Sequence, residues 1–156
     1  MPLEWQIRVA QLADAEQLER LMQAAYQPLQ LRLGGEVLPP LQADYAEEIQ
    51  EYPCWLVEFS ERIIGALLMS FAEYRATIIN VAVDPQFHGQ GIGGLLMRLA
   101  ESAALEKKID RLQLSTHRQL QENLSLYQYL GWREVERRGD KVIFEKSIAT
   151  TPDGMD

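Results

Sequence analysis

The sequence predicts a single α+β domain built around a mixed β-sheet. The chain has 156 residues, of which 47% are hydrophobic and 24% are charged, and this suits one soluble domain with a sizeable core. Its strand-like runs between residues 54 and 83 are apolar on both faces, so other layers must cover them. Stretches with the apolar periodicity of helices precede and follow these runs.

The N-terminal segment predicts a short strand followed by a helix. Residues 6–10 (QIRVA) alternate between polar and apolar side chains, as a strand does. Asp14 and Gln17 have the spacing of a capping box, in which Asp14 is the N-cap. An apolar stripe follows and continues to about Tyr26, where we expect this helix to end.

Prolines and glycines then interrupt the helical pattern. Residues 27–40 contain three prolines and two glycines, which predicts a loop or flap. Residues 41–52 are helical in composition and rich in acidic side chains. Residues 54–59 (CWLVEF) and 63–70 (IIGALLMS) have the composition of strands, and the turn between them predicts a hairpin.

The central part of the chain predicts a strand, a glycine-rich turn, a helix and another strand. The strand is ATIINVAV at residues 76–83. After the glycines, apolar residues at helical spacing predict a helix that lasts to about Lys107. Residues 111–115 (RLQLS) then alternate as a strand does.

The C-terminal part predicts a short helix and a hairpin. Residues 121–131 (QENLSLYQYLG) form the helix, and Gly131 is a suitable C-terminal stop for it. Residues 132–138 and 141–148 are the strands of the hairpin. We therefore expect one domain over residues 1–148, with residues 149–156 as a flexible tail.

Charge and composition exclude several classes of function. Fifteen basic and twenty-three acidic side chains give a net charge of −8, which disfavours nucleic acids and anionic membranes as partners. Two histidines and one cysteine could hardly furnish a zinc site, so no metal is expected. The lone Cys54 lies in an apolar run and is interpreted as a buried structural thiol, which suits a reducing cytoplasm.

The most informative stretch is VDPQFHGQGIGGLLMRL, residues 83–99, in which four glycines fall within residues 89–94. Backbone amides at a helix N-terminus carry partial positive charge, and glycines let a phosphate approach them closely. A Walker loop would need Lys-Ser/Thr after the last glycine, where this chain has Leu95 and Leu96. A dinucleotide fingerprint would follow the first strand rather than lie mid-chain. The alternative is a turn that only packs the helix on the strand.

The segment NVAVDPQFHGQGIGGLLM resembles the acetyl-CoA loop of the GNAT N-acetyltransferases. The core of that loop is Arg/Gln-x-x-Gly-x-Gly/Ala after a strand that ends in V-x-P, and residues 88–93 occupy it, with His88 in the place of Arg or Gln. Residues 123–132 (NLSLYQYLGW) are similar to a second family segment, Asn…Leu-Tyr-x-x-Leu-Gly-Phe. The order of the predicted elements also matches the family along nearly the whole chain.

The resemblance implies a GNAT-like mixed, mostly antiparallel sheet with splayed central strands, flanked by helices, and acetyl-CoA as cosubstrate. The amides of residues 89–94 would bind the pyrophosphate, and the backbones of Val81 and Val83 would pair with the pantetheine arm as an added strand does. Asn123 would cap the late helix or touch the coenzyme. The implied coenzyme-binding residues are Val81, Ala82, Val83, His88, Gly89, Gln90, Gly91, Ile92, Gly93, Gly94, Asn123 and Tyr127.

The implied reaction is direct acetyl transfer from the thioester to a primary amine. A backbone amide near Val81 would stabilise the oxyanion. Tyr127 matches the family tyrosine that faces the coenzyme sulfur, where its hydroxyl can protonate the leaving thiolate. The alternative is that Tyr127 and Tyr129 are only core aromatic residues of an amphipathic helix.

A general base is harder to assign. Relatives carry a glutamate on the strand before the loop or at the end of the next strand, where this chain has Ile79 and Ser115. His117 is the candidate catalytic residue nearby, because an imidazole can relay a proton near neutral pH. It could instead be a surface or turn histidine, and loss of the amine proton to water needs no dedicated base.

The expected partner is an amine, either a small molecule or a peptide N-terminus. Asp44, Glu47 and Glu48 would attract it in its protonated form. We also allow a homodimer. Two other classes of function remain open: a noncatalytic acyl-CoA-binding or sensing module of the same fold, and a protein-interaction domain without a ligand.

Overall fold

The computed structural model describes residues 5–148, and the predicted tail at 149–156 lies outside them. The strands are β1 (Gln6–Val9), β2 (Cys54–Phe59), β3 (Arg62–Phe71), β4 (Ala76–Val83), β5 (Arg111–His117), β6 (Arg133–Arg138) and β7 (Lys141–Ser147). The α-helices are α1 (Ala15–Arg32), α2 (Tyr45–Glu51), α3 (Ile92–Glu106) and α4 (Gln121–Tyr129). Among the described residues, no helix combines the length and the apolar composition needed to cross a membrane.

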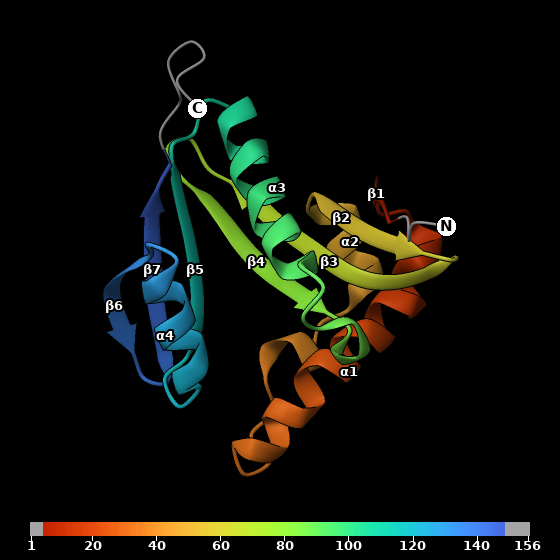
Figure 1. The fold of residues 1–156 in the computed structure, drawn as a ribbon, viewed down its shortest axis with the longest axis horizontal. Helices are drawn as coiled ribbons and strands as arrows, with labels where there is room; N and C mark the ends of the chain where they lie inside the picture. The colour runs from red at the N-terminus through yellow and green to blue at the C-terminus, as the bar shows by residue number, and fades with distance from the viewer. Residues whose placement is uncertain (1–4, 149–156) are drawn as a thin grey trace. The chain divides into compact units, whose positions relative to one another are not determined.

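The seven strands form one mixed sheet in the order β1-β2-β3-β4-β5-β7-β6 (Figure 1). The sheet is mostly antiparallel, and β4 and β5 form its parallel pair, with Ala76 opposite Leu112 and Thr77 opposite Gln113. These pairs lie near the beginning of both strands. The predicted α+β class with a mixed, mostly antiparallel sheet is confirmed.

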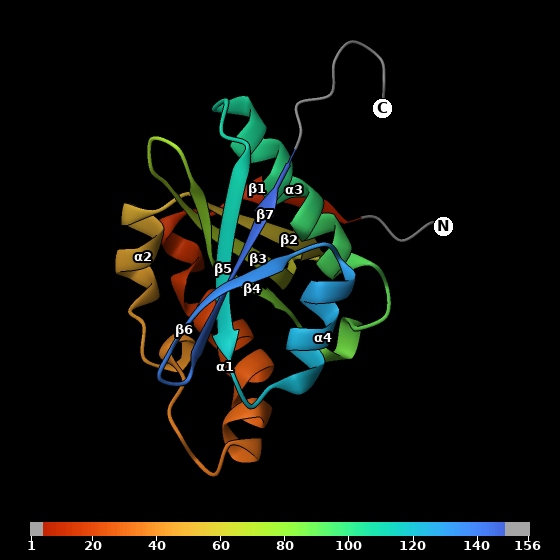
Figure 2. The same ribbon diagram turned by 90° about the vertical axis from the view of Figure 1, so that its left-hand side faces the viewer.

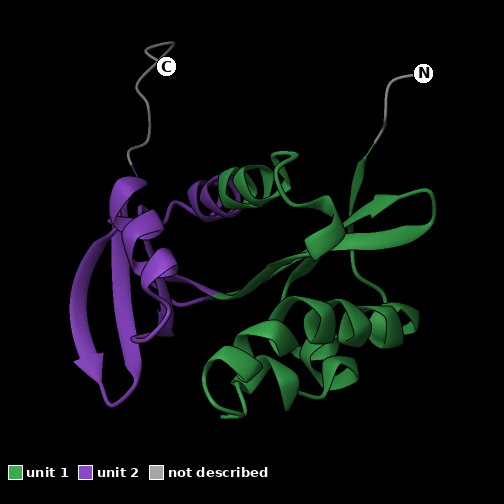
Figure 3. Ribbon diagram, turned by 60° about the horizontal axis from the view of Figure 1, so that its bottom comes forward, with its two compact units in different colours: residues 1–70, 79–99 green, residues 71–78, 100–156 purple. Residues whose placement is uncertain are grey.

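The chain forms two compact units (Figure 3). One contains residues 1–70 and 79–99, and the other contains residues 71–78 and 100–156. Both β4 and α3 pass from one unit into the other. The single domain expected over residues 1–148 stays a prediction.

In the first unit, helices cover both faces of the strands. The buried stripe of α1 packs in one cluster with β2, β3 and β4, and its members include Leu18, Leu21, Met22, Leu56, Ala66, Leu68 and Ala82. The start of α3 lies on the opposite face of the strands (Figure 3). Ile92, the first residue of this helix, lies against β3 at Gly65. A Cβ on Gly65 would lie 3.0 Å from Cγ2 of Ile92, so the glycine allows this helix to approach the strand closely.

In the second unit, β7 lies between β5 and β6 (Figure 1), and Figure 2 turns these three strands toward the viewer. Its register with β5 runs from Arg111 opposite Ser147 to His117 opposite Lys141. The centre of this unit is apolar, and Leu112 and Phe144 are fully buried there.

The prediction that α1 ends near Tyr26 is wrong, because the helix continues through Pro28 to Arg32. A proline inside a helix removes one hydrogen bond and crowds the carbonyl four residues earlier. The half-buried Leu29 continues the apolar stripe of the helix beyond Pro28, which favours helix in spite of this cost. The end comes at Gly34, whose φ is +75°, and the amide of the next glycine, Gly35, donates to the carbonyl of Gln30 at 2.9 Å. This arrangement is a Schellman motif.

The second helix is also shorter than the expected residues 41–52. A 3-10 turn at Pro39–Leu41 precedes α2, which covers Tyr45–Glu51. Asp44 caps α2 by accepting a hydrogen bond from the amide of Glu47 at 3.3 Å.

Cys54 is buried in the first unit, as predicted. Burial, together with the negative charges of Asp14 and Glu48, raises the pKa of its thiol to about 12. The thiol is therefore protonated at neutral pH and acts as a small apolar group.

Asp14 does not have the role that its capping-box spacing with Gln17 predicts. Its side chain makes no cap hydrogen bond to α1. It accepts instead from both terminal nitrogens of Arg8, at 2.8 and 2.9 Å, and from the amide of Gln11 at 2.7 Å. The carboxylate therefore ties β1 to the turn before α1, and its hydrogen bonds with Arg8 lower its pKa.

Replacing Asp14 by asparagine should reduce the free energy of unfolding by about 2 kcal/mol at pH 7, because the paired charge and its bidentate geometry are lost. Since the folded-state pKa is lowered, this stabilisation is fully present above the ordinary pKa of about 3.9 and disappears as the pH falls through the lowered value. Urea unfolding of both proteins at pH 7 and pH 3 measures the difference. The control is Glu16→Gln, which removes an exposed pair with Arg20 and should cost less than about 0.5 kcal/mol.

Candidate functional site

The glycine-rich loop begins at a rigid junction after β4. Asp84 is buried, and its carboxylate accepts from the amide of Gln86 at 2.9 Å and from Nη2 of Arg62 at 2.7 Å. Its own amide donates to the carbonyl of Ile64 in β3 at 2.8 Å. The Arg62 guanidinium also lies 5.3 Å from the centre of the Phe87 ring. These contacts fix where the chain leaves the sheet.

The loop presents a run of unpaired backbone donors. Gly89 and Gly91 have φ values of +81° and +86°, which glycine adopts without strain. Within residues 5–148, the amides of residues 89–94 make no hydrogen bond, and the first paired amide is that of Leu95, which donates to Gly91 at 3.0 Å. They lie at the N-terminal end of α3, where the helix dipole adds partial positive charge. Such an arrangement binds phosphate groups.

The space beside these amides is open. A Cβ built on Gly89 or Gly91 would have no neighbouring atom within 4 Å, so a ligand could occupy the volume that side chains would fill. One cation lies close by, because a Cβ on Gly94 would be 3.4 Å from Nη1 of the exposed Arg98. Arg98 is not among the residues expected from the sequence, although its spacing of four from Gly94 places both on one helix face. The loop therefore offers both partial positive charge and room to an anion such as a diphosphate.

The end of β4 shows which backbone groups could pair with a ligand. Ala82 is buried in the cluster with α1, whereas Val81 and Val83 are half-buried. In a strand, successive residues direct their N–H and C=O groups to opposite edges. The Asp84 amide bonds to β3. By this alternation, the N–H and C=O groups of Val81 and Val83 point to the edge of β4 that faces away from β3. This is the geometry that pairing with an extended pantetheine arm requires.

In the second unit, Tyr127 packs its half-buried ring between two aromatic neighbours. Its ring centre lies 6.0 Å from that of Trp132 and 5.8 Å from that of Phe144. Burial raises the pKa of its hydroxyl, which is therefore protonated at neutral pH and can donate. Within the described residues, this hydroxyl makes no hydrogen bond. Tyr129 is 86% exposed, so the alternative of a core aromatic is wrong for that residue.

Two roles were predicted for Asn123, and one of them, capping α4, is wrong. The N-cap of α4 is Leu120, which makes no side-chain cap bond, and Asn123 lies within the first turn. Its side-chain amide donates to Oγ1 of Thr116 on β5 at 3.1 Å. Asn123 thus ties α4 to β5, and its contact with the coenzyme stays a prediction.

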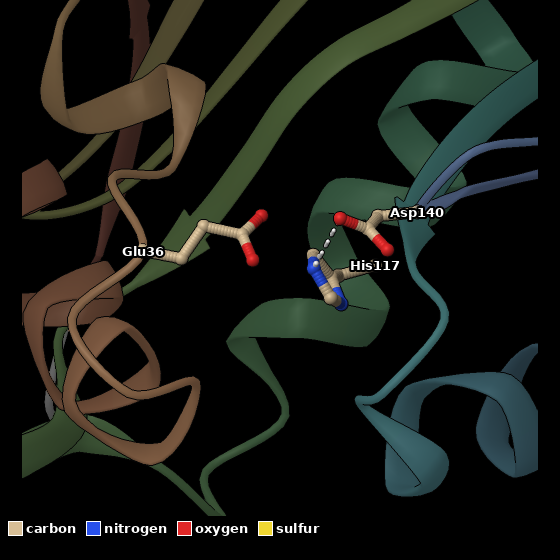
Figure 4. Close-up of side chains that lie close together, drawn as sticks. All are labelled: Glu36, His117 and Asp140. Atoms are coloured by element: carbon tan, nitrogen blue, oxygen red, sulfur yellow. Dashed lines mark ion pairs between the residues drawn. The ribbon is translucent and has the colours of Figure 1, made fainter.

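The contacts of His117 favour a role in the turn after β5. Its Nδ1 accepts from the amide of Gln119 at 3.1 Å. Its Nε2 lies 3.7 Å from Oδ2 of Asp140, and Figure 4 marks this pair by a dashed line. Asp140 also pairs with Arg118 at 2.7 Å, and this hydrogen bond lowers the pKa of Asp140. The bond to Gln119 uses the lone pair of Nδ1 and fits the turn alternative, and the role of His117 as a proton relay stays a prediction.

Comparison with known proteins gives a consistent result. Residues 15–132 match the model of the acetyltransferase (GNAT) family. An uncharacterized N-acetyltransferase of Chlorobaculum tepidum is 25% identical over 133 residues, which are 84% of this chain and 77% of that protein.

Solved structures share the fold. The PaiA N-acetyltransferase of Thermoplasma acidophilum in complex with coenzyme A superposes with a TM-score of 0.79 at 20% identity, over 93% of this chain and 99% of that one. A GNAT family acetyltransferase of Elizabethkingia anophelis with acetyl-CoA bound gives 0.67 at 18% identity, over 92% and 98%. The ribosomal-protein-S18-alanine N-acetyltransferase of Escherichia coli gives 0.71 at 16% identity, over 98% and 99%. With the family match covering most of the chain, this protein belongs to the GNAT acetyltransferase family.

Proposed function

We propose that this protein is an N-acetyltransferase that moves the acetyl group of acetyl-CoA directly to a primary amine. The observation that carries the proposal is the run of unpaired amides at residues 89–94, at the start of a fifteen-residue helix and beside open space. Two of the similar structures hold coenzyme A or acetyl-CoA, which supports the same ligand here.

The coenzyme would be held chiefly by backbone groups. The amides of residues 89–94 would bind the diphosphate, with the Arg98 guanidinium adding charge. The edge of β4 at Val81 and Val83 would pair with the pantetheine arm. His88 replaces the usual Arg or Gln of the family motif. We expect this to cost little, because the amides that would hold the diphosphate are those of residues 89–94, whereas the His88 amide donates to the carbonyl of Pro85 at 3.3 Å.

Acetyl-CoA supplies an activated acetyl group as a thioester. The Val81 amide would donate to the carbonyl oxygen as negative charge develops on it. The Tyr127 hydroxyl would give its proton to the departing sulfur, which its raised pKa permits up to alkaline pH. When a neutral amine attacks, its nitrogen becomes positively charged and loses one proton to solvent, and the Tyr127 phenolate regains a proton from solvent, so we assign no dedicated base.

The charge around α2 supports a cationic acceptor. Asp44, Glu47 and Glu48 lie at the beginning of this helix. Partial burial and the neighbouring carboxylates, foremost Glu51, raise the pKa of Glu48, which shows that negative charges crowd there. A protonated amine would be attracted to such a surface.

Calorimetry with acetyl-CoA and desulfo-CoA, followed by a thiol-release assay against a panel of amines and peptide N-termini, tests the proposal. Both ligands should bind, because diphosphate and pantetheine provide most contacts, and at least one amine should release coenzyme A thiol. Binding without thiol release from any amine would support the noncatalytic sensing module instead. Absence of binding would contradict both functions.

The rate of acetyl transfer should rise with pH from 6 to 9. Only the neutral amine is a nucleophile, so kcat/KM for an amine with a pKa near 10 should increase about tenfold per pH unit below that value. Initial rates at low amine concentration measure this slope. If the acidic side chains steer the amine, its KM should also increase with ionic strength. Transfer to a hydroxyl acceptor and to no amine would contradict N-acetylation while leaving the coenzyme site intact.

A further inference from the structure

We propose that Tyr26 is a positioning residue for acetyl transfer, which acts by donating a hydrogen bond to the backbone carbonyl of Val81. The inference rests on the proposed function, because it concerns the strand edge where the Val81 amide would act. It adds a residue of α1 to a site for which the sequence suggested residues of β4, the loop, β5 and α4.

The contact joins two distant parts of the first unit. The hydroxyl of Tyr26 lies 3.2 Å from the carbonyl oxygen of Val81, fifty-five residues along the chain. The ring is half-buried and packs against the cluster that α1 forms with the strands. Because α1 continues through Pro28 to its Schellman motif, Tyr26 lies inside the helix rather than at a frayed end.

The contact lies on the functional edge of β4. The Asp84 amide donates to Ile64 of β3, so alternation along the strand directs the N–H and C=O groups of Val81 away from β3. The hydrogen bond that Tyr26 donates to the Val81 carbonyl is a second observation that this carbonyl points away from β3. The N–H and C=O groups of Val81 therefore share one edge, and the phenol of Tyr26 lies at that edge.

This placement has an electrostatic consequence. If the Val81 amide stabilises the developing oxyanion, the Val81 carbonyl on the same edge presents negative partial charge close to it. A hydroxyl that donates to the carbonyl offsets that partial charge and holds the peptide in one orientation. The effect grows as charge develops on the oxyanion, so it should lower the barrier more than it strengthens coenzyme binding.

Tyr26→Phe tests the proposal, because it removes the hydroxyl and keeps the ring. We expect kcat to fall about 5- to 30-fold, which is less than the loss of a direct oxyanion donor, while the Kd for desulfo-CoA changes less than twofold. A readout independent of activity is the ¹³C carbonyl shift of Val81 in labelled protein without ligand, which should move when the hydrogen bond is lost.

Tyr45→Phe is the matched control. Tyr45 lies in the same unit and donates to a backbone carbonyl, that of Pro40, at 2.6 Å, but its bond does not involve β4. This variant should keep the parent kcat and the Val81 carbonyl shift. An unchanged kcat in Tyr26→Phe, or an equal fall in both variants, overturns the proposal. A parent protein that binds no acetyl-CoA would instead show that the proposed function itself had failed.

Discussion

Replacing Gly91 by valine is expected to weaken acetyl-CoA binding on the order of 100-fold, which corresponds to about 2.7 kcal/mol. Gly91 has a φ of +86°, a conformation that a β-branched residue does not adopt without strain, so the loop must change shape. A side chain there would also enter the open space beside the unpaired amides. Calorimetry on the purified variant measures the loss.

Gly139→Val is the control for backbone strain. Gly139 also has a positive φ, +57°, and open space around its Cβ position, but it lies in the turn between β6 and β7. We expect it to lower the unfolding temperature without changing the Kd for acetyl-CoA. Parent-like binding by Gly91→Val, in a protein that remains folded, would remove the loop from the coenzyme site.

Local sequence patterns predict the elements of this fold well where one physical signal dominates. The run ATIINVAV coincides with β4, and Gly131, with a φ of +95°, follows the end of α4 as expected. Pro28 wrongly predicts a helix end, because a proline lowers helix propensity locally, whereas the half-buried Leu29 continues the apolar stripe of α1 beyond it. Gly34 and Gly35, which form the Schellman motif, mark the observed end of α1.

The geometry of the glycine-rich loop could be predicted because it depends on local sequence. Unpaired amides, glycines with positive φ and a helix N-terminus all follow from residues that are adjacent in the sequence. The side-chain contacts around the loop and β4 could not be predicted in this way, because the partners are distant in the sequence. Arg62 finds Asp84 across a hairpin, and Tyr26 finds Val81 from another helix. Asn123 likewise bonds to Thr116 rather than capping its own helix. No spacing rule identifies such pairs without the fold.

Replacing Tyr127 by phenylalanine should reduce kcat about 10- to 1000-fold and leave the Kd for acetyl-CoA nearly unchanged, because a proton donor to the leaving sulfur acts in the transition state. The ring contacts with Trp132 and Phe144 remain in the variant, so its unfolding temperature should stay close to that of the parent. Steady-state kinetics with the best amine of the panel, together with calorimetry, separate the two effects.

Tyr129→Phe supplies the matched control, since its hydroxyl lies two residues away on an 86% exposed side chain, and its kcat should equal that of the parent. The pH profile adds a second criterion. Because burial raises the pKa of Tyr127 above its ordinary value of about 10, the hydroxyl keeps its proton below that pH, and the parent rate should show no descending limb there. A descending limb between pH 7 and 9 that survives in Tyr127→Phe would assign the acid to another group. An unchanged kcat across the pH range would leave Tyr127 with a packing role and the thiolate to be protonated by solvent.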